Sequence, residues 1–549
     1  MQKTTFLLLS AIFCCLLSCS SYQDFKKYNY FNGARLYNDT LNFTIKFPGD
    51  IYFKSDFNPR KIKKEVKGIP QLKKALPLAY GNTNMSPYYQ VILFFKEENK
   101  KRNNENSPKI KLLVEDSIHH QILYQSDFGD KSIYLFVKSN TKSKSMKSEK
   151  IDGKNIIESA KFDYSVREEL GYWDVFNRYQ NENNILFVKE KIEKAPIKET
   201  QENEWQKQQI LLTLLSRDPS SEEFKKLIKK PKKKAYQQSL IDKAIKNKEG
   251  VYISKTKTFQ KLKNIAKNER VFMLNESHWM PNNRVLAAQL LPLLKEAGFQ
   301  YLAVEAVYKD KDHTLNERKI PLNTTGYYVR EPYFGLFLRK AKELGFEIIS
   351  YDQFDTENRE LTQAENIYEI IEKDSEAKIF VYAGFSHVFE NEPQTEHEYK
   401  RMAAYFKDIS GINPITIDQT NLLGKTKEKI ILFETEYFPN DEKIKKNTDY
   451  FLLNNMTPNL FEFYPEVEKQ RIRLEIPELL QYKNQEVFIS VYIAEEYEKY
   501  KNYYSIPIKN KIYQVKNDKI NLFLPKEDFY IKIQDKNKDL IFLEKITKK

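Results

Sequence analysis

The chain has 549 residues, enough for about three or four domains, and 41% of them are hydrophobic, so large cores can form. The net charge of +14 could suggest nucleic acid, but 90 basic residues are interleaved with 76 acidic ones, which argues against a nucleic-acid-binding protein. All three cysteines (Cys14, Cys15 and Cys19) lie near the N-terminus, so the body of the chain has no disulfide, thiolate nucleophile or cysteine-ligated zinc. Its chemistry would therefore rely on oxygen and imidazole groups.

The N-terminus is predicted to be a signal segment. Lys3 supplies positive charge, and the apolar core from Phe6 to Leu17 is too short to span a bilayer as a mature helix. The sequence Leu-Leu-Ser-Cys that ends at Cys19 resembles the bacterial lipoprotein signal. This resemblance implies removal of residues 1–18 and acylation of Cys19 with palmitate-like chains. A plain secretory signal is the alternative.

The lipid anchor sets the expected location. Ser20, rather than an aspartate, follows Cys19, which favours the outer membrane among Gram-negative lipoproteins. Two or more acyl chains give a durable anchor. We therefore expect an outer-membrane lipoprotein of the cell envelope, facing the periplasm or the surface, with the membrane as a partner through Cys19 and with no nucleic-acid partner.

The first part of the mature chain is predicted to be mainly β. After a tether over 19–40, residues 41–47 alternate apolar and polar side chains, as in a half-buried strand. Further strand-like runs, at 89–95, 110–114 and 133–137, extend this pattern. We expect a mainly β domain over 41–165 and, from leucines at helical spacing, a helical region over 166–260.

From 261 to 425 strand-like and helix-like segments alternate. The expected strands are 271–274, 301–304, 346–350, 378–382 and 415–417, and the expected helices are 283–297, 332–345, 360–372 and 398–407. Alternation at this spacing implies right-handed crossovers and a parallel sheet covered by helices on both faces.

Residues 426–549 return to short strands separated by turn signals, which predicts a small β-sandwich. The expected strands are 430–433, 472–476, 487–493, 520–524, 530–533 and 540–543. The expected fold is a multidomain α/β protein. It has a central parallel sheet flanked by helices, an N-terminal mainly β domain, a helical region and a C-terminal β-sandwich.

Polar side chains follow the strands of the α/β segment. They are Glu276 and His278, Glu305, Asp352, His387 and Asp418, in strand order. The carboxyl ends of parallel strands lie on one edge of a sheet, where ligands bind. The sequence therefore predicts that these side chains form one site.

Imidazole beside carboxylate suits two kinds of chemistry. A carboxylate that accepts one ring N–H leaves the other nitrogen to take a proton from water. Alternatively, Glu276, His278 and His387 would bind a divalent metal. No His-Glu-x-x-His spacing exists for a zincin-type site, and no Gly-x-Ser-x-Gly elbow exists for a serine nucleophile.

Four short segments carry a family resemblance. They are Asn275-Glu276-Ser277-His278 with Arg284, residues 298–305 (GFQYLAVE), Arg359-Glu360 with Ala364-Glu365-Asn366, and residues 383–388 (AGFSHV). In order and spacing they are similar to the erythromycin esterase-like proteins, which form a wider group with the ChaN-like haem-binding lipoproteins and the TIKI-type metallopeptidases. Asn275 stands where the family has glycine, and one residue rather than two separates Glu276 from His278.

The resemblance implies roles for the acidic and imidazole groups. His278 would be the base that activates water. Glu276 and Glu305 would orient it or help to bind a metal. His387 would polarise the substrate carbonyl or share the base role.

The resemblance also implies substrate-binding residues. Arg284 and Arg359 would stabilise developing negative charge, as a cation does at an acyl-transfer site. The alternatives are that Arg284 only pairs with a carboxylate and that Arg359 only braces a helix. Asp352 is either part of the site or a turn residue, and Tyr328 either lines the pocket or packs. His313 is a weaker candidate.

The expected activity is that of a lipid-anchored hydrolase resembling the erythromycin esterase-like proteins. It would use activated water to cleave an ester, lactone or amide in a small-molecule or peptide substrate. Two alternatives stay open: a ChaN-like lipoprotein that binds haem or another ligand without catalysis, and a TIKI-like peptidase that depends on a divalent metal as cofactor.

Overall fold

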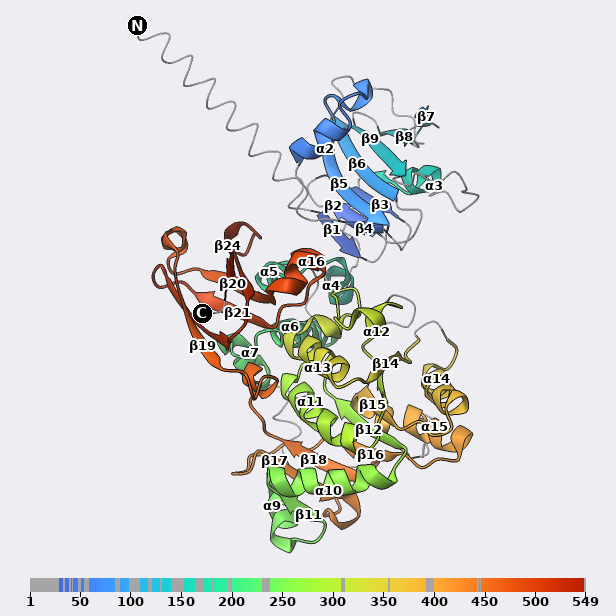
Figure 1. The fold of residues 1–549 in the computed structure, drawn as a ribbon, viewed down its shortest axis with the longest axis vertical. Coiled ribbons are helices and arrows are strands. Elements are labelled where there is room, and N and C mark those ends of the chain that lie inside the picture. The colour runs from blue at the N-terminus through green and yellow to red at the C-terminus, as the bar shows by residue number, and fades with distance from the viewer. Residues whose placement is uncertain are drawn as a thin grey trace. The chain divides into compact units, whose positions relative to one another are not determined.

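The structure, a computed structural model, describes residues 29–547 with internal gaps. The gaps are 33–34, 39–40, 42, 48–50, 54–58, 84–88, 98–108, 117–120, 129–130, 140–152, 163–170, 180–181, 196, 198–199, 230–236, 308–311, 354–355, 392–398, 442–443 and 445. The chain divides into two compact units (Figure 1): unit 1 is Met1–Glu182 with Lys194–Asn203, and unit 2 is Asn183–Glu193 with Glu204–Lys549. The expected signal segment and Cys19 lie outside the described residues.

Unit 1 is built mainly from antiparallel strands. The strands are β1 Asn29–Asn32, β2 Arg35–Asn38, β3 Phe43–Lys46, β4 Ile51–Phe53, β5 Leu76–Thr83, β6 Tyr89–Glu97, β7 Lys109–Asp116, β8 Gln121–Phe128, β9 Lys131–Ser139 and β10 Lys161–Phe162. The helices are α2 Pro59–Glu65, η1 Pro70–Leu72, α3 Gly153–Glu158 and α4 Tyr172–Tyr179. The strands form a four-stranded sheet, β1-β2-β3-β10, and a six-stranded sheet, β4-β5-β6-β9-β8-β7.

Strands β1 and β2 lie in the segment that we expected to be a tether. β2 pairs with β3 in antiparallel register, and Leu36 is buried in one core cluster with Phe43 and Ile45. Leu36 therefore anchors this segment in the core of the sheet. Strands of four residues are too short to show a clear alternation in the sequence, which explains the difference.

Unit 2 contains an eight-stranded mixed sheet. Its strands are β11 Val251–Ile253, β12 Val271–Glu276, β13 Tyr301–Val304, β14 Glu347–Ser350, β15 Ile379–Gly384, β16 Ile415–Asp418, β17 Ile430–Glu434 and β18 Tyr450–Asn454, and their order is β11-β17-β18-β16-β12-β15-β13-β14. The five strands predicted for the α/β segment, β12 to β16, pair in parallel. The protein is therefore mixed α/β with several sheets, as the sequence predicts.

The sheet is wider than expected and is not purely parallel. β18 adds in parallel to β16, whereas β17 and β11 add antiparallel. We expected residues 430–433 to open the C-terminal β-sandwich, but they form most of β17 in the central sheet. The reason is burial: Ile430 to Phe433 are all buried, as in a strand covered on both faces.

Helices of several lengths lie between the strands along the rest of the chain. They are α5 Ile185–Glu193, α6 Gln201–Leu215, α7 Glu222–Leu227, α9 Gln238–Asn247, α10 Lys255–Asn268, α11 Pro281–Glu296, α12 Leu315–Arg318, η2 Tyr328–Arg330, α13 Pro332–Glu343, α14 Arg359–Lys373, η3 Phe385–Val388, α15 Met402–Ser410, η4 Thr435–Tyr437, η5 Leu460–Glu462, η6 Pro477–Tyr482 and α16 Ala494–Tyr504. In the described part of the chain, no helix combines the length and apolar character needed to cross a bilayer.

Alternate side chains of β12 enter two separate cores. Phe272 and Leu274 belong to the cluster that contains buried residues of α11 and α13, whereas Val271 and Met273 belong to the cluster of α14 and α15. Strands buried on both faces are typical of parallel sheets covered by helices. This arrangement fixes the carboxyl end of β12 firmly between its neighbours.

The C-terminal strands form two antiparallel sheets. They are β19 Lys469–Glu475, β20 Glu486–Ile493, β21 Lys509–Gln514, β22 Lys519–Pro525, β23 Phe529–Gln534 and β24 Leu540–Ile546, in the orders β19-β22 and β21-β20-β23-β24. Ile472, Leu522 and Ile531 belong to the same core cluster as α11 and α13. These strands therefore share a core with the α/β part.

We predict that a buried ion pair between α13 and α16 is a major stabilising contact. Arg339 Nε and Nη2 lie 2.8 and 2.6 Å from the two Glu496 carboxylate oxygens, and the side chains are 11% and 7% exposed. Arg339→Met should lower the free energy of unfolding by about 3–5 kcal/mol because it leaves a buried carboxylate without its partner. Urea unfolding followed by circular dichroism measures this change.

The matched control is Lys340→Met. Lys340 pairs with Glu343, whose side chain is 65% exposed, so its loss should cost less than about 1 kcal/mol. Similar destabilisation by both variants would contradict the assignment.

Candidate active site

The sheet order brings three of the expected site segments together. β12 lies next to β15, and β15 lies next to β13, with Glu276 opposite Gly384 in the β12–β15 register. Glu305 follows β13 directly, and its amide nitrogen donates to the Tyr382 carbonyl at 3.2 Å. The carboxyl ends of these neighbouring strands therefore carry Glu276, Glu305 and the turn that begins at Gly384.

His278 and Glu276 form an imidazole–carboxylate pair. His278 Nδ1 lies 3.0 Å from Glu276 Oε1. Arg284 donates to both Glu276 oxygens, at 2.9 and 3.1 Å, and the Tyr382 hydroxyl donates to Oε2 at 3.0 Å. Burial alone would raise the pKa of Glu276, but the Arg284 charge and the hydrogen bonds from His278 and Arg284 lower it. An ionised Glu276 favours the His278 tautomer with hydrogen on Nδ1 and an acceptor at Nε2.

Arg284 is buried and holds neighbouring groups in place, and it is not a surface cation. Its side chain is 1% exposed, and it donates from Nη1 to Glu331 at 2.8 Å and from Nη2 to the His278 carbonyl at 2.7 Å. Glu331 is the N-cap of α13 and accepts from the Tyr333 and Phe334 amides. Arg284 thus positions Glu276 and His278, which differs from its expected contact with substrate.

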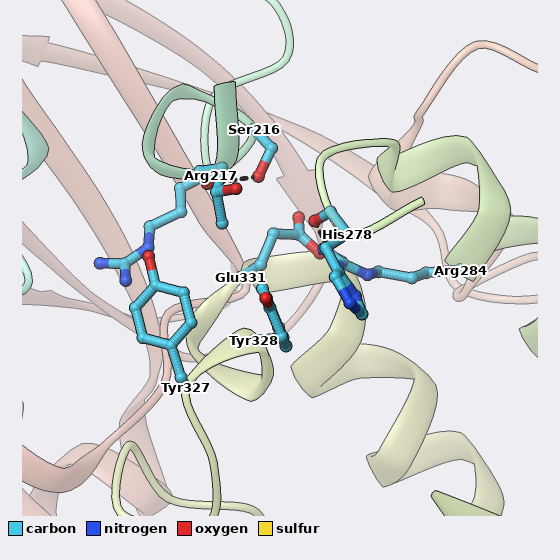
Figure 2. Close-up of a pocket in the computed structure, with 8 residues that line it drawn as sticks. Ser216, Arg217, His278, Arg284, Tyr327, Tyr328 and Glu331 are labelled. Atoms are coloured by element: carbon cyan, nitrogen blue, oxygen red, sulfur yellow. Dashed lines mark hydrogen bonds and ion pairs between the residues drawn. The ribbon is translucent and has the colours of Figure 1, made fainter. Parts of the chain in front are cut away.

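The His278 ring is held between aromatic side chains. Tyr328 stacks on it with 4.0 Å between ring centroids and 13° between planes, and Phe385 meets it edge-on at 5.0 Å. Figure 2 shows the Tyr328 and His278 rings side by side, with Arg284 and Glu331 next to them. Tyr328, expected to bind substrate, thus orients the imidazole.

Figure 2 also shows the polar hollow beside this ring. It is lined by Thr213, Ser216, Arg217, His278, Arg284, Tyr327, Tyr328 and Glu331, and has a volume of about 10 Å³. By that measure a single water molecule needs about 10–15 Å³. The hollow is therefore water-sized and does not admit a substrate.

Glu305 lies at the centre of a second polar network. Its Oε1 lies 3.4 Å from His387 Nε2 and 2.9 Å from Arg359 Nη2, and its Oε2 accepts from the Gly384 amide. Burial alone would raise the pKa of Glu305, but the charges of His387, His278 and Arg359 hold it far below its ordinary value. Glu305 is therefore ionised at neutral pH.

His387 is placed as a cation rather than as a base. Its Nδ1 lies 2.8 Å from Glu360 Oε2, so each ring nitrogen faces a carboxylate. Burial alone would lower the pKa of His387, but Glu305 and Glu360 raise it to about 10. One expectation was that His387 would share the role of the base. This position does not support that role, because a protonated ring has no lone pair to accept a proton.

Arg359 and Asp352 form an ion pair beside Glu305. Arg359 donates from Nε and Nη2 to the two Asp352 oxygens, both at 2.8 Å, and Gln363 donates to Asp352 at 2.7 Å. The Asp352 side chain is 2% exposed, whereas that of Arg359 is 32% exposed. Asp352 therefore anchors Arg359, and Arg359 is the member of this pair that solvent reaches.

Gly384 lets the two networks approach each other closely. A Cβ atom at this position would lie 2.8 Å from both His278 Nε2 and Glu305 Oε2, and 2.6 Å from His278 Cε1. Any side chain there would displace the imidazole or the carboxylate. Glycine thus allows the ring nitrogen and the Glu305 carboxylate to pack against the same backbone position.

Asn275 fixes the turn that follows Gly384. Its amide nitrogen donates to the Phe385 carbonyl at 2.7 Å and to Asp418 at 2.8 Å, and its oxygen accepts from the Gln419 amide at 2.8 Å. Phe385 has a φ of +39°, a strained value for a residue with a side chain. Asp418, the polar residue after the fifth strand, therefore helps to hold this turn and is not part of the network around Glu305.

The donor set does not fit a metal ion. Among the described residues, no group of three or more His, Cys, Asp or Glu side chains is arranged to hold one. Glu276 already accepts from Arg284, Tyr382 and His278, and His387 is protonated between two carboxylates. Metal ligands must be deprotonated and have a lone pair available, so the expected set of Glu276, His278 and His387 disagrees with the structure.

Several side chains that contact the predicted site residues were not themselves predicted from the sequence to belong to the site. Glu331 precedes a proline at a helix start, so its N-cap role was detectable, but its ion pair with Arg284 was not. Tyr382 lies inside an apolar strand and looks like a core residue. Glu360 was included only in the Arg359-Glu360 segment, whereas it pairs with both His387 and Arg401. His313 is exposed and takes no part in the described networks.

Comparisons with known proteins give little further guidance. No protein-family model matches the chain, and no curated protein sequence matches it. Solved structures with limited similarity include RRSP, a MARTX toxin effector domain from Vibrio vulnificus CMCP6, at 13% identity and a TM-score of 0.22, covering 30% of this chain and 35% of that one. The type III effector HopBA1 has 14% identity and a TM-score of 0.25, covering 38% of this chain and 97% of that one. Scores this low carry no argument about fold or function.

We predict that His387 is an imidazolium throughout the neutral range. Because its pKa is raised to about 10, its ring should keep both protons from pH 6 to pH 9. NMR of protein labelled at the histidine ring carbons measures this, with His387→Gln used to assign the signal. The signal of the exposed His313 serves as an internal reference for the assignment. Loss of a ring proton from His387 between pH 6 and pH 9 would contradict the prediction.

Proposed function

We propose that the protein is a hydrolase in which His278 takes a proton from water and the resulting hydroxide attacks an ester, lactone or amide carbonyl. The single observation that carries the proposal is the arrangement around Gly384. A buried, ionised Glu276 holds His278 Nδ1, while His278 Nε2 and Glu305 Oε2 both lie 2.8 Å from the position that a Cβ atom of residue 384 would occupy, so the two groups are neighbours beside Gly384.

The proposed water binds between His278 Nε2 and Glu305 Oε2, beside Gly384. It donates one proton to His278 Nε2 and its other hydrogen to Glu305 Oε2, whose hydrogen bond from the Gly384 amide leaves a lone pair available. As the hydroxide attacks, the proton stays on the imidazole and is then passed to the leaving alcohol or amine. Glu276 stabilises the imidazolium formed between these two steps.

Cations next to Glu305 suit the charge that develops on the substrate. Attack on a carbonyl produces an oxyanion, and preorganised positive groups lower its energy. Arg359 is about one-third exposed and is held in place by Asp352, while His387 keeps its proton within the same network. In the proposed mechanism Arg359 contacts the oxyanion, and His387 and Asp352 act as positioning residues.

The proposal also covers the substrate class, the roles of the domains and the membrane anchor. The site suits a small-molecule or peptide substrate, and its chemistry is that of the erythromycin esterase-like group, which the sequence resembles between residues 268 and 418. We propose that the eight-stranded sheet with its helices is the catalytic part and that the C-terminal strands form a β-sandwich-like accessory layer. We further propose that acylated Cys19 anchors the protein to the cell envelope.

We predict that His278→Gln lowers kcat/KM by about 10²–10⁴-fold, the usual cost of losing a general base. The assay is a panel of p-nitrophenyl esters, lactones and short peptide amides, with a fixed metal-free buffer. Glu276→Gln should reduce kcat in the same direction because the ring loses its anionic partner. His313→Gln, on an exposed loop, is the control and should keep full activity. Equal hydrolysis by wild type and His278→Gln on every substrate would end the proposal.

We predict that Gly384→Ala abolishes hydrolysis while the protein stays folded. The added methyl carbon would lie 2.8 Å from both His278 Nε2 and Glu305 Oε2, so it would displace the two groups that hold the proposed water. Circular dichroism and the urea midpoint report on folding, and the same ester panel reports on activity. Gly411→Ala, which meets no atom within 4 Å but has a φ of +66°, controls for the general cost of losing a glycine. Full activity in Gly384→Ala would show that the water does not bind there.

A further inference from the structure

A second pocket lies apart from the site at Gly384. Its lining comes from the segment after α6, from α7, from the start of α13, from the loop before η5 and from the start of β21. Its volume is about 370 Å³, at the lower end of the 300–1,000 Å³ that is typical of small-molecule sites. Arg217 lines both this pocket and the water-sized hollow beside His278.

The lining is strongly basic. Arg217, Lys225, Lys509 and Lys511 line the pocket, and Asp218 is the acidic residue among them. Asp218 is 1% exposed, and its carboxylate accepts from the Ile512 amide at 2.7 Å and from the Ser220 hydroxyl at 2.6 Å. Asp218 therefore holds the chain in place, and as the one acidic residue among four basic ones in the lining it offsets only part of the positive charge.

Two of these cations interact electrostatically with Asp218 but are not held by it in an ion pair. In the part of the chain that the structure describes, Lys509 and Lys511 form no ion pair, whereas Lys225 pairs with Glu222 at 2.7 Å. The Lys509 ammonium lies 3.4 Å from the Phe523 carbonyl, a neutral acceptor. Burial and the neighbouring Lys511 lower the pKa of Lys509. Like charges held together in a partly buried site favour a bound anion.

An independent observation points to a ligand at the same place. Asn510, between the two lysines, lines the pocket and is 6% exposed, and its side-chain oxygen has no hydrogen-bond partner among the described residues. A buried acceptor without a donor is costly, so a donor from a ligand would stabilise it. A hydroxyl group supplies such a donor.

Flat and apolar groups complete the lining. Pro332 and Tyr333 contribute from the start of α13, Pro458 contributes from the loop before η5, and Phe461 contributes from η5 itself. Pockets of this kind bury the body of a ligand against apolar and aromatic surface and use a few polar groups for orientation. The combination suits an oxyanion carried on a compact hydroxylated ring.

We propose that this pocket binds a small hydroxylated oxyanion, a sugar phosphate or sugar acid, with Lys509, Lys511 and Arg217 facing the anionic group and Asn510 accepting from a hydroxyl. The same chemistry is present in a free metabolite and in the head group of an anionic lipid. The site is separate from the proposed hydrolytic water, so the proposal does not depend on the proposed function.

The test measures binding to the full chain by isothermal titration calorimetry at low salt. The probes are glucose 6-phosphate, glucuronate, inorganic phosphate and uncharged glucose, together with phosphatidylcholine vesicles with and without phosphatidylglycerol. We expect glucose 6-phosphate or glucuronate to bind at least tenfold more tightly than glucose, and the affinity to fall as salt screens the charges. Binding to phosphatidylglycerol vesicles alone would assign the oxyanion to a lipid source.

Matched variants locate the binding. Lys511→Met and Asn510→Leu should each weaken binding about tenfold, whereas Lys516→Met, an exposed lysine after β21, should leave it unchanged. Asn510→Leu changes no charge, so its effect on affinity reports on the hydrogen bond and not on the electrostatic attraction. His278→Ala should bind like wild type, which separates this pocket from the hydrolytic site. Absence of binding to every anionic probe, or equal affinities in Lys511→Met and Lys516→Met, would overturn the proposal.

Discussion

The buried guanidinium of Arg284 is the constraint on which the site depends. A fully desolvated cation is tolerated only with close anionic partners, and Arg284 has two, Glu276 and Glu331. These three side chains come from α11, from the end of β12 and from the cap of α13. Loss of Arg284 would leave two buried carboxyl groups without their shared donor, so this one side chain holds the three elements together. His278 takes its orientation from this triad, through Glu276 and through its own carbonyl.

The second network uses charge in a different way. Around Glu305, cationic and anionic groups alternate, and the outer members Glu360, Arg401 and Asp352 satisfy the inner ones. Such alternation keeps every ionised group paired in a site that solvent only partly reaches. The two networks meet across Gly384. In the proposed mechanism the first network supplies the proton acceptor, His278, and the second supplies positive charge for the substrate.

The sequence predicted the elements of the α/β part well because their signals are local. The apolar runs at 271–274 and 301–304 and the polar residues after them placed Glu276 and Glu305 at one edge. The partners of strands and of charged side chains were harder to predict. Nothing local distinguishes Ile430–Glu434 of the central sheet from a sandwich strand, and the partners of Arg284 and His387 lie 47 and 27 residues away in the chain. Protonation depends on such partners, so the cationic state of His387 was not visible in its sequence position.

Asn275 ties the end of β12 to the turn that carries His387. Its carboxamide reaches the Phe385 carbonyl in that turn, and also Asp418 and the Gln419 amide after β16. Glycine at this position would remove the donor to the Phe385 carbonyl, whereas Asp418 would keep its hydrogen bonds from Thr420 and Asn421. A side chain that faces neither Glu305 nor His387 thus supports the backbone on which the second network is built, so a change at position 275 would be felt at a distance from it.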